Sequence, residues 1–281
     1  PQDPALQNQI HYLQTQAHYP ACRNTDVTYY GDTNAALEAQ KTDLRKAQHF
    51  IFMEYHAIED STAWQGIEDI LAERAAGVEV RVFYDDMGSI GFVDTAFAKK
   101  LQQRGIQCRV FNPIVPVLNV FMNNRDHRKI TVIDGQVGYT GGYNLADEYF
   151  NLTHPYGRWK DSGVRLEGDA VRNLTLIFLE MWGTTQKEMP AIEPYLPAIR
   201  YTAREAATVL PYADNPLDDK RVGEDVYLNF INSAQRYVYI TTPYLILSDE
   251  MQRALVLAAQ RGVDVRIITP GIPDKKLIFS V

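Results

Sequence analysis

Apolar and polar positions follow two different periods along the chain. Trp64, Ile67 and Leu71 are spaced as on one face of a helix. Runs of branched and aromatic residues at 50–55 and 78–84 are typical of strands. Because helical and strand patterns alternate in this way over most of the chain, the sequence predicts an α/β fold.

The expected helices and strands are short and closely spaced. The predicted helices cover residues 35–47, 64–71, 93–101 and 171–181. The predicted strands cover residues 50–55, 78–84, 107–111, 130–133, 136–139 and 164–166. Between two of these strands, the dipeptide Asp134-Gly135 is a strong signal for a tight hairpin.

The chain contains an internal repeat. Residues 47–58 read AQHFIFMEYHAI, and residues 234–245, 187 positions later, read AQRYVYITTPYL. Residues 77–82 read GVEVRV, and residues 262–267, 185 positions later, read GVDVRI. The nearly constant spacing predicts two similar α/β lobes in tandem, with the second cut short at residue 281. The alternative is that any two strand–helix–strand units look alike.

The distribution of proline and glutamine suggests where the lobes end. Five of the 14 prolines lie between Pro190 and Pro216, a density that excludes a helix or a long strand. The Gln-rich start of the chain is expected to form a polar helix or a loose arm. The predicted division is residues 1–26 as a polar N-terminal arm, 27–190 as the first lobe, 191–224 as a Pro-rich connection and 225–281 as the start of the second lobe.

Composition narrows the class of protein. Hydrophobic residues make up 46% and charged residues 22%, which excludes a wholly disordered chain. The net charge of −7 argues against broad nucleic-acid binding, which usually needs a basic face. Two cysteines exclude a disulfide scaffold. Since no apolar run reaches about 18 residues, the sequence predicts no transmembrane helix in this chain.

One segment carries a pattern suited to chemistry. His127, Lys129 and Asp134 fit H-x-K-x4-D, and residues 141–144 follow as G-G-x-N. On an extended strand, residues two apart point to the same face, so His127 and Lys129 are expected to project together. An imidazole can act as nucleophile or proton donor, and a lysine beside it can neutralise phosphate oxygens in a transition state. The pattern therefore predicts phosphodiester chemistry.

The residues that follow fit the same interpretation. Gly141 and Gly142 lack side chains, so their backbone N–H groups can approach an anion closely. Asn144 can donate a hydrogen bond to a phosphate oxygen, and Asp134 either orients a ring nitrogen or fixes the hairpin. Carboxylates and cysteines with metal-ligand spacing are absent from the sequence, so we expect neither a metal nor another cofactor.

Other residues near the predicted site allow two interpretations each. Glu54 and His56 lie at the end of the first predicted strand, where side chains either line a pocket or are structural. The apolar, Pro-interrupted residues 113–122 precede the motif and either guide a lipid to His127 or form a buried connection.

With these motifs, the chain resembles the phospholipase D superfamily and, within it, the bacterial cardiolipin synthases. The narrower resemblance rests on residues 84–89, 139–149, 159–161, 242–245 and 270–276. It implies a mixed sheet flanked by helices, repeated in two lobes. It also implies a bacterial cytoplasmic membrane location for the parent protein, a membrane surface and an anionic phospholipid as partners, and no nucleic acid. The oligomeric state is left open.

The resemblance also implies a reaction. Family members form a covalent phosphohistidine intermediate without a metal, and cardiolipin synthases condense two phosphatidylglycerols to cardiolipin and glycerol. By this resemblance His127 is the nucleophile, although the general-acid role stays open, Lys129 and Asn144 hold phosphate, and Asp134 supports the motif. A phospholipase or nuclease of the same superfamily, and a catalytically incomplete lipid-binding fragment, are the alternatives.

The sequence departs from the family in one respect. Family members use two H-x-K motifs, and this chain has one. His127 follows Gly77 by 50 residues, and the equivalent point after Gly262 lies beyond Val281. We therefore expect a fragment or an unseen tail, and negligible turnover from the fragment alone. A third option is two chains that pair their single motifs, but the partial second lobe argues against it.

Overall fold

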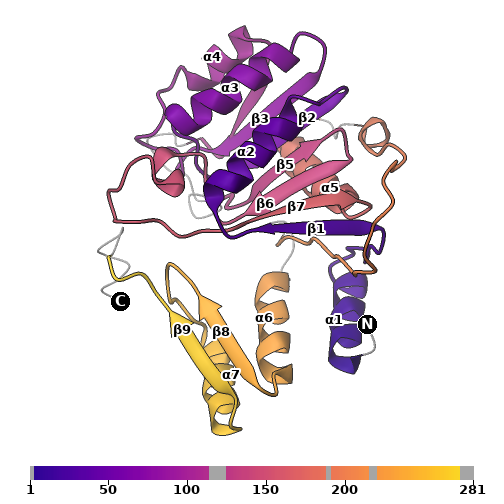
Figure 1. Cartoon of the computed structure of the whole chain (residues 1–281), viewed down its shortest axis with the longest axis vertical. Helices are drawn as coiled ribbons and strands as arrows, with labels where there is room; N and C mark the ends of the chain where they lie inside the picture. The colour runs from indigo at the N-terminus through magenta and orange to yellow at the C-terminus, as the bar shows by residue number, and fades with distance from the viewer. Residues whose placement is uncertain (1–2, 114–124, 188–190, 215–219, 273–281) are drawn as a thin grey trace. The chain divides into compact units, whose positions relative to one another are not determined.

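A computed structural model describes residues 3–113, 125–187, 191–214 and 220–272 (Figure 1). The chain forms two compact units. One contains Ala21–Pro211, and the other combines Pro1–Pro20 with Tyr212–Val281. Most of residues 113–122, which by one of the two interpretations guide a lipid to the site, lie outside the described residues.

The unit of residues 21–211 is built on one seven-stranded sheet. The strands are β1 (Thr25–Tyr30), β2 (Phe50–Tyr55), β3 (Glu79–Asp85), β4 (Gln107–Phe111), β5 (Lys129–Ile133), β6 (Val137–Gly141) and β7 (Gly163–Gly168). Their order is β1-β7-β6-β5-β2-β3-β4. The pairs β2·β3 and β3·β4 are parallel, and the other four are antiparallel. The predicted α/β fold with a mixed sheet is confirmed.

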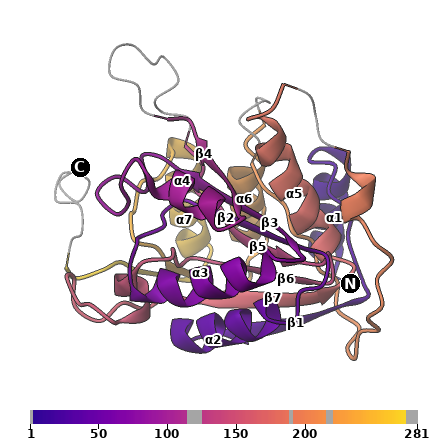
Figure 2. The ribbon, with the colours of Figure 1, turned by 90° about the horizontal axis from the view of Figure 1, so that it is seen from above.

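Helices cover both faces of this sheet (Figure 2). They are α2 (Thr33–Leu44), α3 (Thr62–Arg74), α4 (Phe97–Gln103) and α5 (Val171–Gly183), with two short 3₁₀ turns, η1 (Asp147–Phe150) and η2 (Glu193–Tyr195). Alternate residues of β2 point to opposite faces. Ile51 and Met53 join the core formed with α2, α3 and α4, whereas Phe52 stacks on Phe178 of α5 with ring centroids 4.6 Å apart. All six residues of β2 are therefore buried.

The predicted hairpin joins β5 to β6. Asp134 and Gly135 have φ angles of 52° and 63°, as in a type I′ turn, and Gln136 N donates to Ile133 O at 3.0 Å. A positive φ is tolerated by Gly and by Asp better than by other residues, which explains the dipeptide at this turn.

The second unit repeats part of the first. Its elements are α1 (Pro4–Thr15), α6 (Val222–Ser233), β8 (Tyr237–Thr241), α7 (Asp249–Gln260) and β9 (Asp264–Ile268). β8 and β9 are parallel, as β2 and β3 are. The order α6–β8–α7–β9 matches α2–β2–α3–β3, and β8 begins 187 residues after β2. The structure thus confirms the second, similar lobe.

The ends of the units differ from the predicted division. The leading residues form α1, which contacts α6, and the Tyr12 hydroxyl donates to the carboxylate of Asp225. Residues 191–211 pack with the first unit, where the Tyr195 hydroxyl donates to Glu79 at 2.9 Å and accepts from Arg81. In the described parts of the chain, the structure has no helix long and apolar enough to cross a membrane.

Candidate active site

The candidate site lies where the parallel strands β2 and β3 end and the antiparallel strand β5 begins. Tyr55, at the end of β2, pairs with Lys129, at the start of β5. His56 follows β2, and His127 immediately precedes β5. The sheet order therefore brings the two histidines together although they are far apart in the sequence.

The two imidazoles are neighbours, with ring centroids 4.6 Å apart. His56 Nδ1 lies 2.6 Å from the carbonyl oxygen of Asp126. Because a carbonyl oxygen only accepts, Nδ1 carries the hydrogen, and the lone pair of the neutral ring is on Nε2. Burial lowers the pKa of His56, which favours this neutral form. His127 is exposed and therefore accessible to a substrate.

Lys129 supplies a buried positive charge next to the backbone of His127. Its side chain is buried, with 5% of the residue exposed, and Nζ donates to the carbonyl oxygen of His127 at 2.7 Å. Burial lowers the pKa of the Lys129 ammonium to about 8, while the charges of Asp126 and Asp161 oppose this shift. The lysine is therefore mostly charged at neutral pH.

Asn144 holds the chain after β2. Its Oδ1 accepts from Ala57 N at 3.1 Å, and its Nδ2 donates to the Tyr149 hydroxyl at 2.9 Å. Because Ala57 follows His56, these bonds fix the backbone next to that imidazole. The amide carries two N–H groups and Tyr149 takes one of them.

Gly141 and Gly142 make room for neighbouring groups. A Cβ on Gly142 would lie 2.2 Å from Asp161 Oδ1, and one on Gly141 would lie 2.6 Å from Ser162 O. The Gly142 N–H donates to Ser162 O at 3.2 Å, so in this conformation it does not face an anion. The role that the structure indicates for Gly142 is thus close packing against Asp161, a residue to which the sequence assigned no role.

The Asp161 carboxylate is held beside the positive charge of Lys129. Its oxygens accept from Ser162 N at 2.8 Å and from the Trp159 indole at 3.2 Å. Burial raises the pKa of Asp161, and the charge of Lys129 lowers it. The G-G pair 19 to 20 residues earlier could have suggested a close packing partner, but not which residue it is.

Asp134 lies at the opposite end of β5. Its carboxylate accepts from the backbone N–H groups of residues 48, 49 and 50 at 2.8, 2.7 and 2.9 Å. At about 3.3 Å per strand residue, Asp134 lies roughly 16 Å from Lys129. Its hydrogen bonds fix the hairpin to the start of β2, at the end of the strand away from the imidazoles.

Near the two histidines, buried carboxyl groups pair with guanidinium groups. Glu54, predicted as a pocket residue, is fully buried, and its Oε1 lies 3.4 Å from Arg128 Nη1. Asp85 Oδ2 accepts from Asp126 N at 3.0 Å, and its Oδ1 lies 3.4 Å from Arg125 Nη1. The described residues contain no group of three or more His, Cys, Asp or Glu side chains arranged to hold a metal ion.

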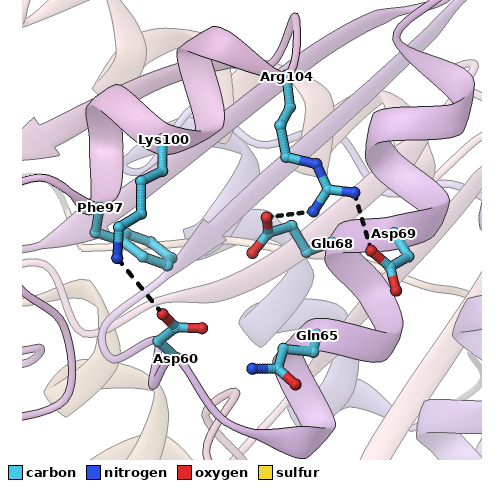
Figure 3. A pocket seen from close by; sticks show the side chains of 7 residues that line it. All are labelled: Asp60, Gln65, Glu68, Asp69, Phe97, Lys100 and Arg104. Carbon is cyan, nitrogen blue, oxygen red and sulfur yellow. Dashed lines mark hydrogen bonds and ion pairs between the residues drawn. The ribbon is translucent and has the colours of Figure 1, made fainter.

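A cavity of about 310 Å³ between α3 and α4 contains none of these site residues (Figure 3). Arg104 crosses it to Glu68 and Asp69, at 2.5 and 2.9 Å, and Lys100 lies 3.9 Å from Asp60. The charged side chains of this cavity are paired with one another, so we place the candidate site at the histidines.

A family model described as "Cardiolipin synthase, PLD-like domain" matches residues 41–182 and 227–279. These ranges include both histidines, Lys129 and Asn144, and together exceed half of the chain. The chain belongs to the cardiolipin synthase-like branch of the phospholipase D superfamily.

Curated relatives agree with this family. The chain is 34% identical over 265 residues to a cardiolipin synthase of Halalkalibacterium halodurans. The match covers 94% of the chain and 52% of that protein. It is 47% identical over 275 residues to an uncharacterized protein of Streptococcus mutans, covering 98% of the chain and 59% of that protein. The chain thus spans slightly more than half the length of these two relatives.

A solved structure has a fold similar to that of this chain. The phosphatidylserine synthase of Haemophilus influenzae superposes with a TM-score of 0.64 over 94% of this chain and 66% of that one, at 13% sequence identity. At this identity the likeness concerns the fold alone.

Proposed function

We propose that this chain belongs to a phosphatidyltransferase that condenses two phosphatidylglycerols to cardiolipin and glycerol at His127. The observation that carries the proposal is the exposed His127, whose backbone carbonyl oxygen accepts from the buried Lys129 ammonium, within a cardiolipin synthase-like domain. A nucleophile that reaches solvent, beside a cation that does not, suits attack on an anionic phosphodiester.

The proposed reaction has two displacements. A nitrogen of His127 attacks phosphorus, the bond to one glycerol oxygen breaks, and glycerol leaves with a proton from a general acid. A hydroxyl group of the second phosphatidylglycerol then attacks the phosphohistidine, loses its proton to the same group, and releases His127. Lys129 stabilises the negative charge on the phosphoryl oxygens in both steps. By family resemblance the general acid is the histidine of a second motif.

The same proposal includes a membrane surface. Phosphatidylglycerol is an anionic bilayer lipid, so the whole protein would act at a membrane, and we infer the bacterial cytoplasmic membrane from the family resemblance. The proposed partner is therefore the head group of an anionic phospholipid rather than a nucleic acid, in line with the net charge of −7.

A product assay tests the proposal. The whole protein, with the second motif that the family resemblance implies, is purified and incubated with labelled phosphatidylglycerol in mixed micelles, and its lipid products are separated. Transfer gives cardiolipin with free glycerol, whereas hydrolysis gives phosphatidic acid and would replace the proposal by the phospholipase alternative. Acid quenching followed by intact-mass spectrometry detects a phosphatidyl adduct.

His127→Ala should remove the adduct and both products. The matched control is His49→Ala, because His49 is an exposed histidine at the far end of β2. An adduct that persists in His127→Ala would contradict the assignment of the nucleophile.

A further inference from the structure

Two buried carboxyl groups lie next to each other beneath the histidines. Glu54 is 0% exposed and Asp126 is 3% exposed. One oxygen of each has a donor: Arg128 Nη1 lies 3.4 Å from Glu54 Oε1, and Arg128 N donates to Asp126 Oδ1 at 3.0 Å. The other two oxygens, Glu54 Oε2 and Asp126 Oδ2, are buried and accept from no donor in the described residues.

The two carboxyl groups are within hydrogen-bonding reach of each other. Two ionised carboxylates are acceptors only, so they cannot bond to each other without a proton. A single proton between them satisfies both otherwise unbonded oxygens and removes one of two adjacent buried charges. We propose that Glu54 and Asp126 share one proton at neutral pH, and that this protonated pair positions the segment carrying His127.

The charges around the pair favour a single negative charge on it. The charged and titratable groups that face it come from four elements: His56 after β2, Asp85 at the end of β3, Arg125, Arg128 and Lys129 in and before β5, and Glu180 on α5. The Arg128 guanidinium matches one negative charge on the pair. A second negative charge on the pair would be repelled by the neighbouring carboxylate of Asp85.

The pair can position His127 because Asp126 is bonded on three sides. Its carbonyl oxygen accepts from His56 Nδ1 at 2.6 Å, and its N–H donates to Asp85 Oδ2 at 3.0 Å. Its carboxylate accepts from Arg128 N, on the other side of His127. Moving the Asp126 carboxylate would therefore move the backbone on both sides of His127. That this matters for catalysis rests on the proposed function, whereas the shared proton does not.

Infrared spectroscopy tests the shared proton directly. At neutral pH the protein should show the carbonyl stretch of a protonated carboxylic acid, and Glu54→Gln and Asp126→Asn should each lose it. Asp43→Asn is the matched control, because Asp43 is a buried carboxylate whose pKa is lowered by the Tyr139 hydroxyl and Arg165, and it should leave the band unchanged. A spectrum without the band, or a band that survives in both variants, overturns the proposal.

The pH dependence of unfolding tests the same proton in solution. A folded state that holds an extra proton loses stability as pH rises above the ordinary carboxyl range, by up to about tenfold in the unfolding constant per pH unit. In Glu54→Gln the amide donates to Asp126 Oδ2 and does not titrate. The variant should therefore gain stability relative to the wild type as pH rises. A difference that does not change with pH contradicts the pair.

Catalytic positioning has its own measurement. In the product assay Glu54→Gln should keep most of the activity, and Glu54→Leu, which cannot donate to Asp126, should lose at least about tenfold. Equal activity in both variants overturns the positioning role. If the whole wild-type protein forms no cardiolipin, the proposed function fails, while the infrared band and the unfolding curves still decide whether the proton is shared.

Discussion

The imidazole rings of His56 and His127 lie with their centroids 4.6 Å apart and their planes inclined by 53°. The two residues come from the end of β2 and the start of the β5 segment, and the antiparallel pairing of these strands brings them together. The ring of His56 is anchored to the Asp126 carbonyl, whereas His127 is exposed. His56 is thus a neighbour of the candidate nucleophile and more than an isolated core histidine.

Replacing His56 by Phe tests this relationship. The variant keeps a ring but loses the hydrogen bond to Asp126, so we expect the proposed activity to fall by about tenfold or more. Burial lowers the pKa of His56, so the folded protein binds fewer protons than the unfolded chain between that pKa and about 6.5. The contribution of His56 to wild-type stability should therefore rise with pH up to about 6.5, whatever the trend set by the other groups.

Urea unfolding at pH 5 and pH 7 measures the effect of this substitution on stability. The wild type should gain more stability between these two pH values than His56→Phe does. The same gain in both proteins would show that His56 titrates normally.

Gly88 leaves space for His56. A Cβ at this position would lie 2.2 Å from the backbone oxygen of His56 and 2.7 Å from both Cε1 and Nε2 of its ring. We expect Gly88→Ala to displace the imidazole and to lower the activity by at least about tenfold, because small displacements of catalytic groups are costly. Gly77→Ala is the control, since a Cβ there meets nothing within 4 Å. Equal activities of the two variants would rule out this packing argument.

We expect Lys129 to lower the unfolding free energy of the protein although it is needed for the proposed activity. Burial lowers its pKa from 10.5 to about 8, so the ammonium is disfavoured in the folded state. Stability should therefore rise between pH 8 and about 10.5, where the unfolded chain still binds the proton. At pH 7 we expect Lys129→Met to be more stable by about 1–3 kcal/mol, and inactive in the product assay.

Denaturation curves at pH 7 and pH 10 measure this difference, which should shrink at the higher pH. Lys99→Met, at an exposed position on α4, is the control and should change little at either pH. A Lys129→Met protein that is less stable than the wild type at pH 7 would contradict the expectation.

Asp134 is expected to act on stability rather than on the reaction. Removing its carboxylate leaves three backbone N–H groups at the start of β2 without their acceptor, so Asp134→Ala should lose about 2–4 kcal/mol of unfolding free energy. Asp134→Asn, which keeps one acceptor oxygen and tolerates the positive φ, should lose less.

Thermal unfolding, together with activity per folded molecule, separates the two effects of replacing Asp134. Asp69→Ala, which removes an exposed ion pair with Arg104, should cost under about 1 kcal/mol. If the folded fraction of Asp134→Ala were inactive, Asp134 would have a role in the site as well.

Local patterns in the chain were sufficient to predict part of the fold. The alternation of helix and strand, the hairpin at Asp134-Gly135 and the repeat that relates β2 to β8 follow from periodicity and turn chemistry within short windows. The H-x-K spacing placed His127 and Lys129 at one strand end for the same reason.

The contacts between residues far apart in the chain depend on how the whole sheet is assembled. The strand order β1-β7-β6-β5-β2-β3-β4 cannot be predicted from any single segment of the sequence. This order places His56 beside His127 and Glu54 beside Asp126. It also takes Asp134 away from the imidazoles to the amides of residues 48–50. Local periodicity specifies which face of an element is apolar, whereas the pairing of strands depends on packing between segments that are far apart in the chain.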